Sequence, residues 1–309
     1  MHHPLVTIAI PTYNRADTYF QTALDSALQQ SYGRVDVLVS DNSTNDATSD
    51  LIEEDYANDE RLRYVHHEEN LGAIGNFNYC LNAARGEFFL LLHDDDCIDL
   101  DLIETCVNGL HSPSGVGYVR TGVRLIDQQG NVTEQHPNEA FGSQGAQAVL
   151  EWMRFKNFWT LSSTLYETEA LRAVGGFDHD TFRLTCDCYA TATIAIQTGG
   201  GVELRPVKAS FRVHEGELGH QVSPLGWIDE WARLYRHIMH IAPSPEVREH
   251  FRKEGAEFFS HLCYNYAMRV PSLTGRLRAY TSVYSKFGGR YLPPPLRKRL
   301  RSIKNFFLH

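Results

Sequence analysis

The chain has 309 residues, of which 42% are hydrophobic and 22% charged, with a formal net charge of −9. This length suits one large α/β domain with a helical extension, or two modest domains. It contains no run of about 20 apolar residues, so we expect no transmembrane helix. The N-terminus shows no basic region followed by an apolar stretch, so we expect no secretion signal.

The cysteines and the charge distribution favour a cytoplasmic protein that does not act mainly on nucleic acid. The six cysteines form no CxxC pair and no zinc-like spacing, so we expect reduced thiols. Seven basic residues and no acidic residue follow Ser285, whereas the rest of the chain is acidic. A basic tail on an acidic body indicates that the tail alone contacts an anionic surface.

The first half of the chain alternates predicted strands and helices. Val6–Ile10 lacks polar alternation, as a buried parallel strand does. Asp17 can cap a helix with one apolar face, formed by Phe20, Ala23, Leu24, Ala27 and Leu28. Further strands are expected over 35–40, 62–66 and 88–92, and helices around 51–52 and over 76–84. This order predicts a mostly parallel sheet with helices on both faces.

The second half is predicted to be more mixed and to end in helices. We expect these elements in order: a strand over 116–126, a turn at 128–130, a loop over 139–144, a strand over 160–166, helices over 168–174 and 187–197, and strands near 202 and over 209–213. Aromatic stripes beyond Ser223 fall at helical spacing and are typical of a helical core; they comprise Trp227, Trp231, Leu234, Tyr235 and Ile238, then Phe258, Leu262 and Tyr266. We therefore divide the chain into residues 1–220 and a helical extension, 221–309.

Polar clusters follow three of the predicted strands, at 11–15, 41–43 and 93–96. Ligands of open α/β sheets bind at the carboxyl ends of the strands. Because parallel strands end at the same edge, we expect these clusters to converge on one binding site.

The acidic cluster His93-Asp94-Asp95-Asp96 has two interpretations. Neighbouring carboxylates repel one another unless a cation neutralises them, and Mg²⁺ and Mn²⁺ prefer oxygen ligands. Alternatively the region is a solvated loop or a helix start, with Asp99 or Asp101 capping a helix from Leu102.

Asp41 follows the second predicted strand, where a carboxylate can meet a nucleoside. The alternative is an Asx-turn within Asp41-Asn42-Ser43. The chain has neither G-x-G-x-x-G after the first strand nor a P-loop motif, which disfavours nicotinamide cofactors and P-loop chemistry. A bound diphosphate would therefore be neutralised by the metal cluster.

Several motifs together resemble the family 2 glycosyltransferases, which have a GT-A fold. The motifs are Ile10–Arg15, Asp41–Ser43, Asn70–Gly72, Leu92–Asp96, Val174–Asp178 and Arg212–His214. The resemblance spans residues 5–215 and implies an α/β GT-A catalytic domain that binds a nucleotide-sugar.

The resemblance implies roles for the matched residues. Those expected to contact the donor nucleotide are Pro11, Thr12, Tyr13, Arg15, Asp41, Asn70 and Asp94. Asp41 would read the imide of uracil or thymine, so UDP- or dTDP-sugars are favoured. Asp95 and His214 would hold Mn²⁺ or Mg²⁺, although a lone histidine is as often structural. His93 departs from the family pattern, in which the first residue of this motif is usually aspartate.

Asp187 occupies the position of the catalytic base in the family, and Cys186 replaces the usual glutamate before it. An N-cap role for Asp187 is the alternative, and hydrogen bonds from helix amides would lower its pKa. The implied reaction is inverting transfer of a sugar to a glycan or lipid-linked hydroxyl, with specificity in 141–163 and the C-terminal helices. Two other functions stay open: a non-catalytic nucleotide-sugar-binding protein and a sugar nucleotidyltransferase, although the glycine-rich loop of the latter is missing.

The C-terminal tail is predicted to form a basic amphipathic helix after Pro293–Pro295. Its apolar stripe is Leu296, Leu300, Ile303 and Phe307. Such a helix suits an anionic membrane, which predicts peripheral attachment at the cytoplasmic face. Packing of the stripe against the acidic body is the alternative.

Overall fold

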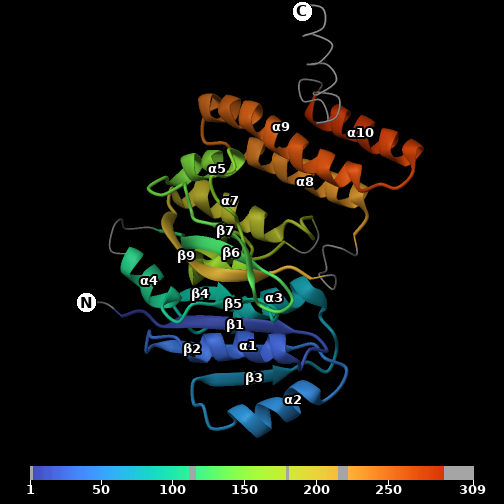
Figure 1. Cartoon of the computed structure of the whole chain (residues 1–309). Coiled ribbons are helices and arrows are strands. Elements are labelled where there is room, and N and C mark those ends of the chain that lie inside the picture. The colour runs from blue at the N-terminus through green and yellow to red at the C-terminus, as the bar shows by residue number, and fades with distance from the viewer. Residues whose placement is uncertain (1–2, 111–115, 179–180, 215–221, 289–309) are drawn as a thin grey trace, which may run out of the picture. The chain divides into compact units, whose positions relative to one another are not determined.

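The chain divides into two units, Met1–Glu215 and Gly216–His309, in a computed structural model that describes residues 3–110, 116–178, 181–214 and 222–288. The described part of the first unit contains a nine-stranded sheet in the order β3-β2-β1-β4-β8-β6-β9-β5, with β7 paired to β6 (Figure 1). The strands are β1 (Val6–Thr12), β2 (Val35–Asp41), β3 (Leu62–His66), β4 (Phe88–Leu91), β5 (Cys97–Ile98), β6 (Tyr118–Ile126), β7 (Val132–His136), β8 (Thr164–Glu167) and β9 (Val202–Arg212).

The sheet is mostly parallel, as the sequence predicted. Strands β1 to β4, β6 and β9 run in the same direction, whereas β5, β7 and β8 run against them. Every residue of β1 and of β2 is buried, as expected for parallel strands that helices cover on both faces. The register pairs Thr12 with Asp41, so both strands end at the same edge of the sheet.

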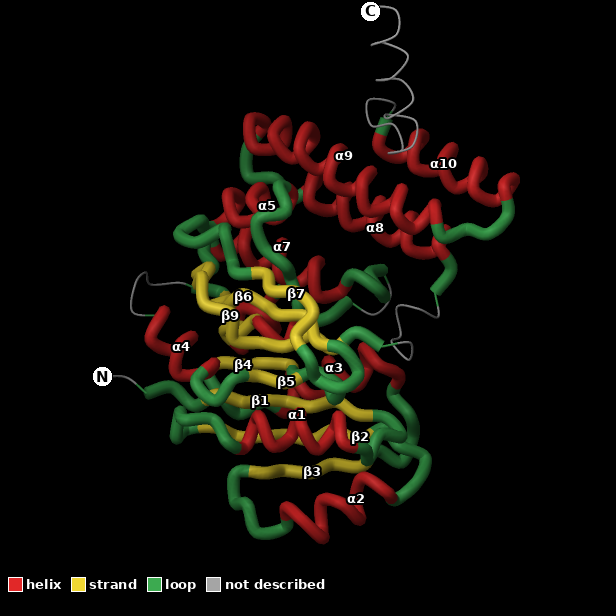
Figure 2. The backbone as a smooth tube through the Cα atoms, viewed as in Figure 1, coloured by secondary structure: helices red, strands yellow, loops and turns green. Residues whose placement is uncertain are grey.

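Helices cover the sheet on both sides (Figure 2). They are α1 (Thr18–Leu28), α2 (Ala47–Leu51), the π-helical turn η1 (Ile52–Tyr56), α3 (Gly72–Ala83), α4 (Leu102–Gly109), α5 (Gly145–Met153), α6 (Thr168–Ala173) and α7 (Cys186–Thr198). Asp17 caps α1 as predicted, because its Oδ1 accepts the backbone N–H groups of Tyr19 and Phe20. The buried face of α1 is the predicted one, and it packs with α4 into the core beside β1.

Two local predictions were wrong, and one capping alternative holds only in part. The segment 160–166 begins as a 3₁₀ turn, η2 (Leu161–Ser163), because the side chains of Ser163 and Thr164 donate to the carbonyl of Thr160 and close a tight turn. The two strands expected at 202 and 209–213 are one strand, β9, which continues through irregular register opposite β6. Asp101 is the N-cap residue of α4, as one alternative had it, but its side chain makes no capping bond to the helix; its carboxylate accepts from Lys208 Nζ at 2.8 and 2.6 Å instead.

The described part of the second unit consists of α8 (Pro224–His240), α9 (Pro245–Met268) and α10 (Leu273–Phe287), which confirms the helical extension. A serine caps each helix through its hydroxyl: Ser223, Ser244 and Ser272. The predicted aromatic stripes stack between helices, with ring centroids 5.0 Å apart for Trp227 and Tyr266.

The remaining sequence predictions on the fold have mixed outcomes. All six cysteines are free thiols, as expected. Within the described residues, no helix combines the length and apolar character needed to span a membrane. The predicted tail helix, 293–308, lies outside the described residues.

Candidate active site

The polar clusters at the strand ends converge, as the sequence predicted. Thr12, at the end of β1, donates its hydroxyl to Asp94 Oδ2 at 2.7 Å. Asn14, which has the positive φ of 50° that asparagine tolerates, accepts the N–H of Thr44 at 2.9 Å. Asn42 accepts the N–H of Leu71 at 3.2 Å. The loops after β1, β2, β3 and β4 therefore form one continuous surface at the carboxyl edge of the sheet.

The loop after β4 holds its three aspartates in different environments. Asp94 lies 3.5 Å from Arg15 Nε, and burial together with the charge of Asp95 raises its pKa to about 6. Asp95 Oδ2 lies 2.9 Å from His214 Nε2 and 3.6 Å from Arg15 NH1. Asp95 therefore sits between two side chains from distant parts of the sequence.

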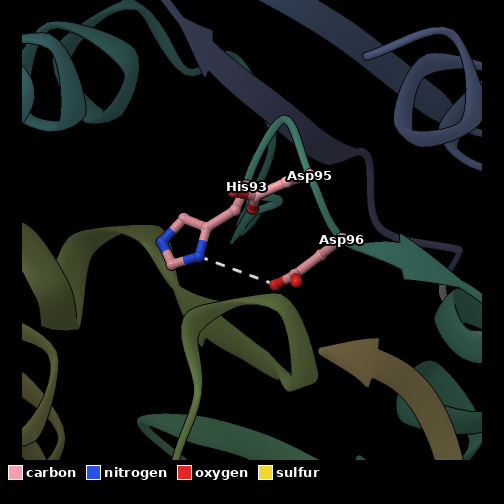
Figure 3. A group of neighbouring side chains, drawn as sticks. All are labelled: His93, Asp95 and Asp96. Carbon is pink, nitrogen blue, oxygen red and sulfur yellow. Dashed lines mark ion pairs between the residues drawn. The ribbon is translucent and has the colours of Figure 1, made fainter. Parts of the chain in front are cut away.

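Asp96 is fully buried and ties three segments together. Its Oδ2 accepts the hydroxyl of Ser162 in η2 at 2.6 Å, and its Oδ1 accepts the backbone N–H of Arg212 at 2.9 Å. The same carboxylate lies 3.6 Å from His93 Nδ1 (Figure 3). Because protein groups already occupy both oxygens, Asp96 orients its neighbours.

His93 keeps a defined orientation although it departs from the family pattern. Its ring stacks on Phe77 at 5.9 Å between centroids, and Figure 3 shows it turned toward Asp96. Burial lowers the pKa of His93, but the nearby carboxylates of Asp96, Asp95 and Asp94 outweigh burial and raise the pKa to about 9. At neutral pH the ring is therefore an imidazolium that balances part of the acidic loop.

The donor set of this loop fits a divalent cation. Ligand atoms of His93, Asp95 and Asp96 lie within 4.8 Å of one another, and the Asp96 side chain also accepts hydrogen bonds from Ser162 and Arg212. Asp95, with His214 beside it and Asp94 next in the loop, offers carboxylate oxygens and one imidazole nitrogen. Carboxylates suit Mg²⁺ and Mn²⁺.

Asp187 lies in the first turn of α7, and the N-cap is Thr185, so the N-cap alternative for Asp187 was wrong. Burial raises the pKa of Asp187, whereas helix N–H groups and the charge of His93 lower it. The net direction is upward, contrary to the expected lowering, because desolvation outweighs the helix amides. A carboxylate with a raised pKa is a stronger base.

Asp41 forms the Asx-turn that the sequence left as an alternative. Its side chain is buried, Oδ1 accepts the N–H of Ser43 at 2.7 Å, and Oδ2 accepts the hydroxyl of Tyr64 at 2.8 Å. Asn70 Oδ1 accepts the N–H of Gly72, the first residue of α3, in an Asx-turn before the helix. Of the other expected donor contacts, Pro11 is buried within β1, whereas the ring of Tyr13 is half exposed at the loop surface.

Sequence reasoning missed Arg212 and Tyr19. Arg212 Nε donates to the backbone oxygen of Asp95 at 2.8 Å, and its guanidinium lies 4.3 Å from the ring centre of Tyr19. The Tyr19 ring also contacts His214 at 5.8 Å and donates its hydroxyl to Gln128 O at 3.1 Å. The motif Arg212-Val213-His214 was a signal for Arg212, but nothing local marked Tyr19, which faces the site only in three dimensions.

Ligands of open α/β sheets bind at this carboxyl edge, and an acidic loop with basic side chains around it suits a ligand that carries phosphate groups and a divalent cation. Known proteins agree, because the sequence model of glycosyl transferase family 2 matches residues 7–173. The chain belongs to this family. The matched region contains the loops after β1 to β4 but not Asp187, Arg212 or His214.

Two relatives illustrate the similarity. Chondroitin synthase of Escherichia coli is 32% identical over 129 residues, covering 42% of this chain and 18% of that protein. GalNAc(5)-diNAcBac-PP-undecaprenol β-1,3-glucosyltransferase of Campylobacter jejuni is 28% identical over 134 residues, covering 43% of this chain and 42% of that protein. The chain thus spans less than half the length of either relative.

Solved structures confirm the GT-A fold. S. aureus TarS 1-349 in complex with UDP superposes with a TM-score of 0.67 at 17% identity, covering 91% of this chain and 80% of that chain. The mannosyltransferase PcManGT of Pyrobaculum calidifontis, in complex with GDP-Man and Mn²⁺, gives a TM-score of 0.59 at 17% identity, covering 100% and 81%.

Proposed function

We propose that this chain is a metal-dependent inverting glycosyltransferase that takes a sugar from a nucleotide-sugar donor. The observation that carries the proposal is the approach of Asp95 and His214, 2.9 Å apart, at the carboxyl edge of the sheet. Asp95 belongs to the family-matched region, and His214 comes from the segment after β9. Asp95 and His214 thus bring the family-matched region and the segment after β9 together at the carboxyl edge of the sheet. A cation held there would neutralise a bound diphosphate.

The donor nucleotide is proposed to lie along the loops after β1, β2 and β3. Tyr13 offers an exposed ring for stacking on the base, and Arg15, between Asp94 and Asp95, offers a cation to the diphosphate. Asp41 accepts from the N3–H of uracil or thymine through the lone pairs that Ser43 and Tyr64 leave free. The TarS complex with UDP supports a UDP-sugar as donor, whereas the PcManGT complex with GDP-Man supports a guanine nucleotide instead.

Asp95 and His214, with Asp94 nearby, are proposed to hold Mn²⁺ or Mg²⁺. A bound cation acts as a Lewis acid on the leaving diphosphate. Arg212 holds the backbone of Asp95 and so fixes the direction of its carboxylate. The PcManGT complex with Mn²⁺ supports the choice of manganese.

Asp187 is proposed to be the general base. It takes the proton of the acceptor hydroxyl while that oxygen attacks the anomeric carbon. The bond from this carbon to the nucleoside diphosphate breaks, and its electron pair leaves with the diphosphate. Attack from the opposite face inverts the anomeric configuration without a covalent enzyme intermediate. The raised pKa of Asp187 supports this role.

The acceptor is proposed to be a glycan or a lipid-linked hydroxyl. The name of the C. jejuni relative describes an undecaprenol-linked substrate, which supports the lipid-linked alternative. A cytoplasmic location, with the tail against an anionic membrane surface, fits such an acceptor and rests on the sequence alone.

The test is a screen of nucleotide-sugars for thermal stabilisation in the presence of Mn²⁺, because a ligand that binds the native state raises the melting temperature. Hydrolysis of the stabilising donor is then measured with and without metal. A transferase hydrolyses the donor slowly and only with metal. Stabilisation without any turnover would indicate the non-catalytic binding protein, and release of pyrophosphate from a nucleoside triphosphate would indicate the nucleotidyltransferase.

A further inference from the structure

One helix of the second unit presents apolar side chains to solvent along its length. Leu273, Leu277 and Tyr284 of α10 are 71%, 57% and 55% exposed. At the roughly 100° per residue of an α-helix, these three positions fall within about 40° of one another. We call these three residues the α10 stripe. Among the described residues of this unit, the large apolar side chains that are exposed are these three and Met268, close before α10.

The α10 stripe is not the face by which α10 packs on its neighbours. Ala279, Val283 and Phe287 are buried, and the ring of Phe287 lies 5.7 Å from Tyr235 of α8 and 6.3 Å from Phe259 of α9. The α10 stripe lies about 100° around the helix from this buried face. Figure 1 shows α10 alongside α8 and α9.

The charged side chains of α10 itself have one sign, and Arg278 lies about 120° around the helix from the centre of the α10 stripe. The helix contains Arg276, Arg278 and Lys286 and no acidic residue, and no Asp or Glu follows Glu257 in the chain. Arg276 donates to the carbonyl of Val270 and Lys286 pairs with Asp229, whereas Arg278 is exposed. By contrast, α9 has four glutamates between 246 and 257. The only described helix of this unit without acidic residues is therefore the one with the exposed stripe.

We propose that the α10 stripe docks this protein on an anionic membrane surface. Leucine side chains partition into the interfacial region of a bilayer, tyrosine suits the boundary with the headgroups, and arginine pairs with anionic lipids. The proposal deepens the proposed function and rests on it for its purpose, because a lipid-linked acceptor lies at such a surface. Vesicle binding needs neither donor nor acceptor, so it is measured independently of transfer.

The test is co-sedimentation of the full chain with vesicles of phosphatidylcholine and phosphatidylserine. Leu277→Ser/Tyr284→Ser should lower the vesicle partition coefficient about tenfold or more, because the variant lacks two apolar side chains that the bilayer would bury. The matched control is Leu100→Ser/Val132→Ser, which changes two similarly exposed residues of the first unit and should bind as the parent does. Circular dichroism confirms that each variant is folded.

A second full-length variant separates the α10 stripe from the tail. Its substitutions are Arg297→Gln, Lys298→Gln, Arg299→Gln, Arg301→Gln and Lys304→Gln. The proposal is supported if this tail variant still binds the vesicles and if adding Leu277→Ser/Tyr284→Ser to it removes that binding. Binding unaffected by Leu277→Ser/Tyr284→Ser, or equal binding to phosphatidylcholine alone, overturns it. A change of oligomeric state in the α10 variant without vesicles also overturns it, because the stripe would then contact a second copy.

Discussion

His214 Nε2 lies 2.9 Å from Asp95 Oδ2, although 119 residues separate them in the sequence. The two side chains come from distant segments of the first unit, since Asp95 follows β4 near its middle and His214 follows β9 at its end. Arg212 strengthens the junction by donating to the backbone of Asp95. The proposed cation site is thus completed only when the last strand of the sheet is in place.

Asp95→Asn should abolish metal-stimulated transfer while the protein stays folded, because it removes a carboxylate charge with little change of shape. Transfer is measured against Mn²⁺ concentration, and circular dichroism reports the fold. Asp55→Asn, at an exposed position of η1, is the matched control. Undiminished transfer by folded Asp95→Asn would remove Asp95 from the metal site.

Arg212→Lys should raise the Mn²⁺ concentration needed for half-maximal activity by about 10- to 100-fold, the range for partners that orient a ligand. Lysine keeps the charge but lacks the planar guanidinium, which donates to the backbone oxygen of Asp95 and lies over the Tyr19 ring. Arg205→Lys, on an exposed part of β9, is the control. A lower turnover at saturating Mn²⁺, with unchanged Mn²⁺ dependence, would contradict an orienting role.

Asp187→Asn should lower turnover by more than the ~10²-fold low end for loss of a general base, with donor affinity little changed. Turnover and the dissociation constant of the donor are measured side by side, with Glu169→Gln on α6 as the control. If donor affinity falls in step with turnover, Asp187 binds the donor or supports the fold instead.

The pH profile gives a second test of Asp187. A base acts only when deprotonated, so turnover should fall as pH drops through its pKa. Because burial raises this pKa, the acidic limb should lie above the pH of about 4 expected for an ordinary carboxyl. An acidic limb at or below that value would show that another group limits the rate.

Asp94→Asn should make the metal-free protein more stable near neutral pH. The pKa of Asp94 is about 6 in the folded protein, above the 3.8 of an ordinary aspartate, so the folded state binds the proton more tightly. Its stabilising contribution is complete below about pH 4 and is lost as pH rises through about 6. The melting temperature of Asp94→Asn should therefore exceed that of the parent at pH 7.5 and match it at pH 4.

Adding Mn²⁺ should reverse this order, because a cation stabilises the ionised Asp94 of the parent more than the amide. Melting curves at both pH values, with and without Mn²⁺, are measured for the parent and for Asp94→Asn. A lower melting temperature for metal-free Asp94→Asn at pH 7.5 would show that the bonds to Thr12 and Arg15 outweigh the cost of burial.

UDP or dTDP should bind more tightly than CDP or GDP. Asp41 can accept from the N3–H of uracil or thymine, whereas cytosine presents an acceptor at N3. Competition against a fluorescent nucleotide measures the order. GDP as the tightest ligand would overturn the base assignment and would favour a donor like that of the PcManGT complex.

The sequence predicted those parts of the fold in which local pattern and burial agree. β1 and β2 are buried on both faces, so their apolar runs were unambiguous, and Asp17 caps α1 through bonds to the next residues along the chain. The turn over 160–163 was mistaken for a strand because its β-branched and apolar residues favour strands. Side-chain bonds to the carbonyl of Thr160 decide its conformation instead.

The site was predictable to the extent that residues cluster along the chain. The aspartates after β4 and the loop after β1 were found because each motif is contiguous. Tyr19 and Ser162 were missed because their partners, Arg212 and Asp96, are distant in sequence. The pKa direction of Asp187 was also misjudged, because helix amides are visible in the sequence while burial is not.

The carboxylate of Asp96 has a practical consequence for segment exchange between related enzymes. It bonds to Ser162, 66 residues away, and to the backbone of Arg212, 116 residues away. A chimera that imports residues 141–163 from a relative to change the acceptor would also replace the hydroxyl that positions the acidic loop. Grafts that keep a serine at 162 should preserve donor binding, whereas grafts without it should lose donor binding together with the old acceptor preference.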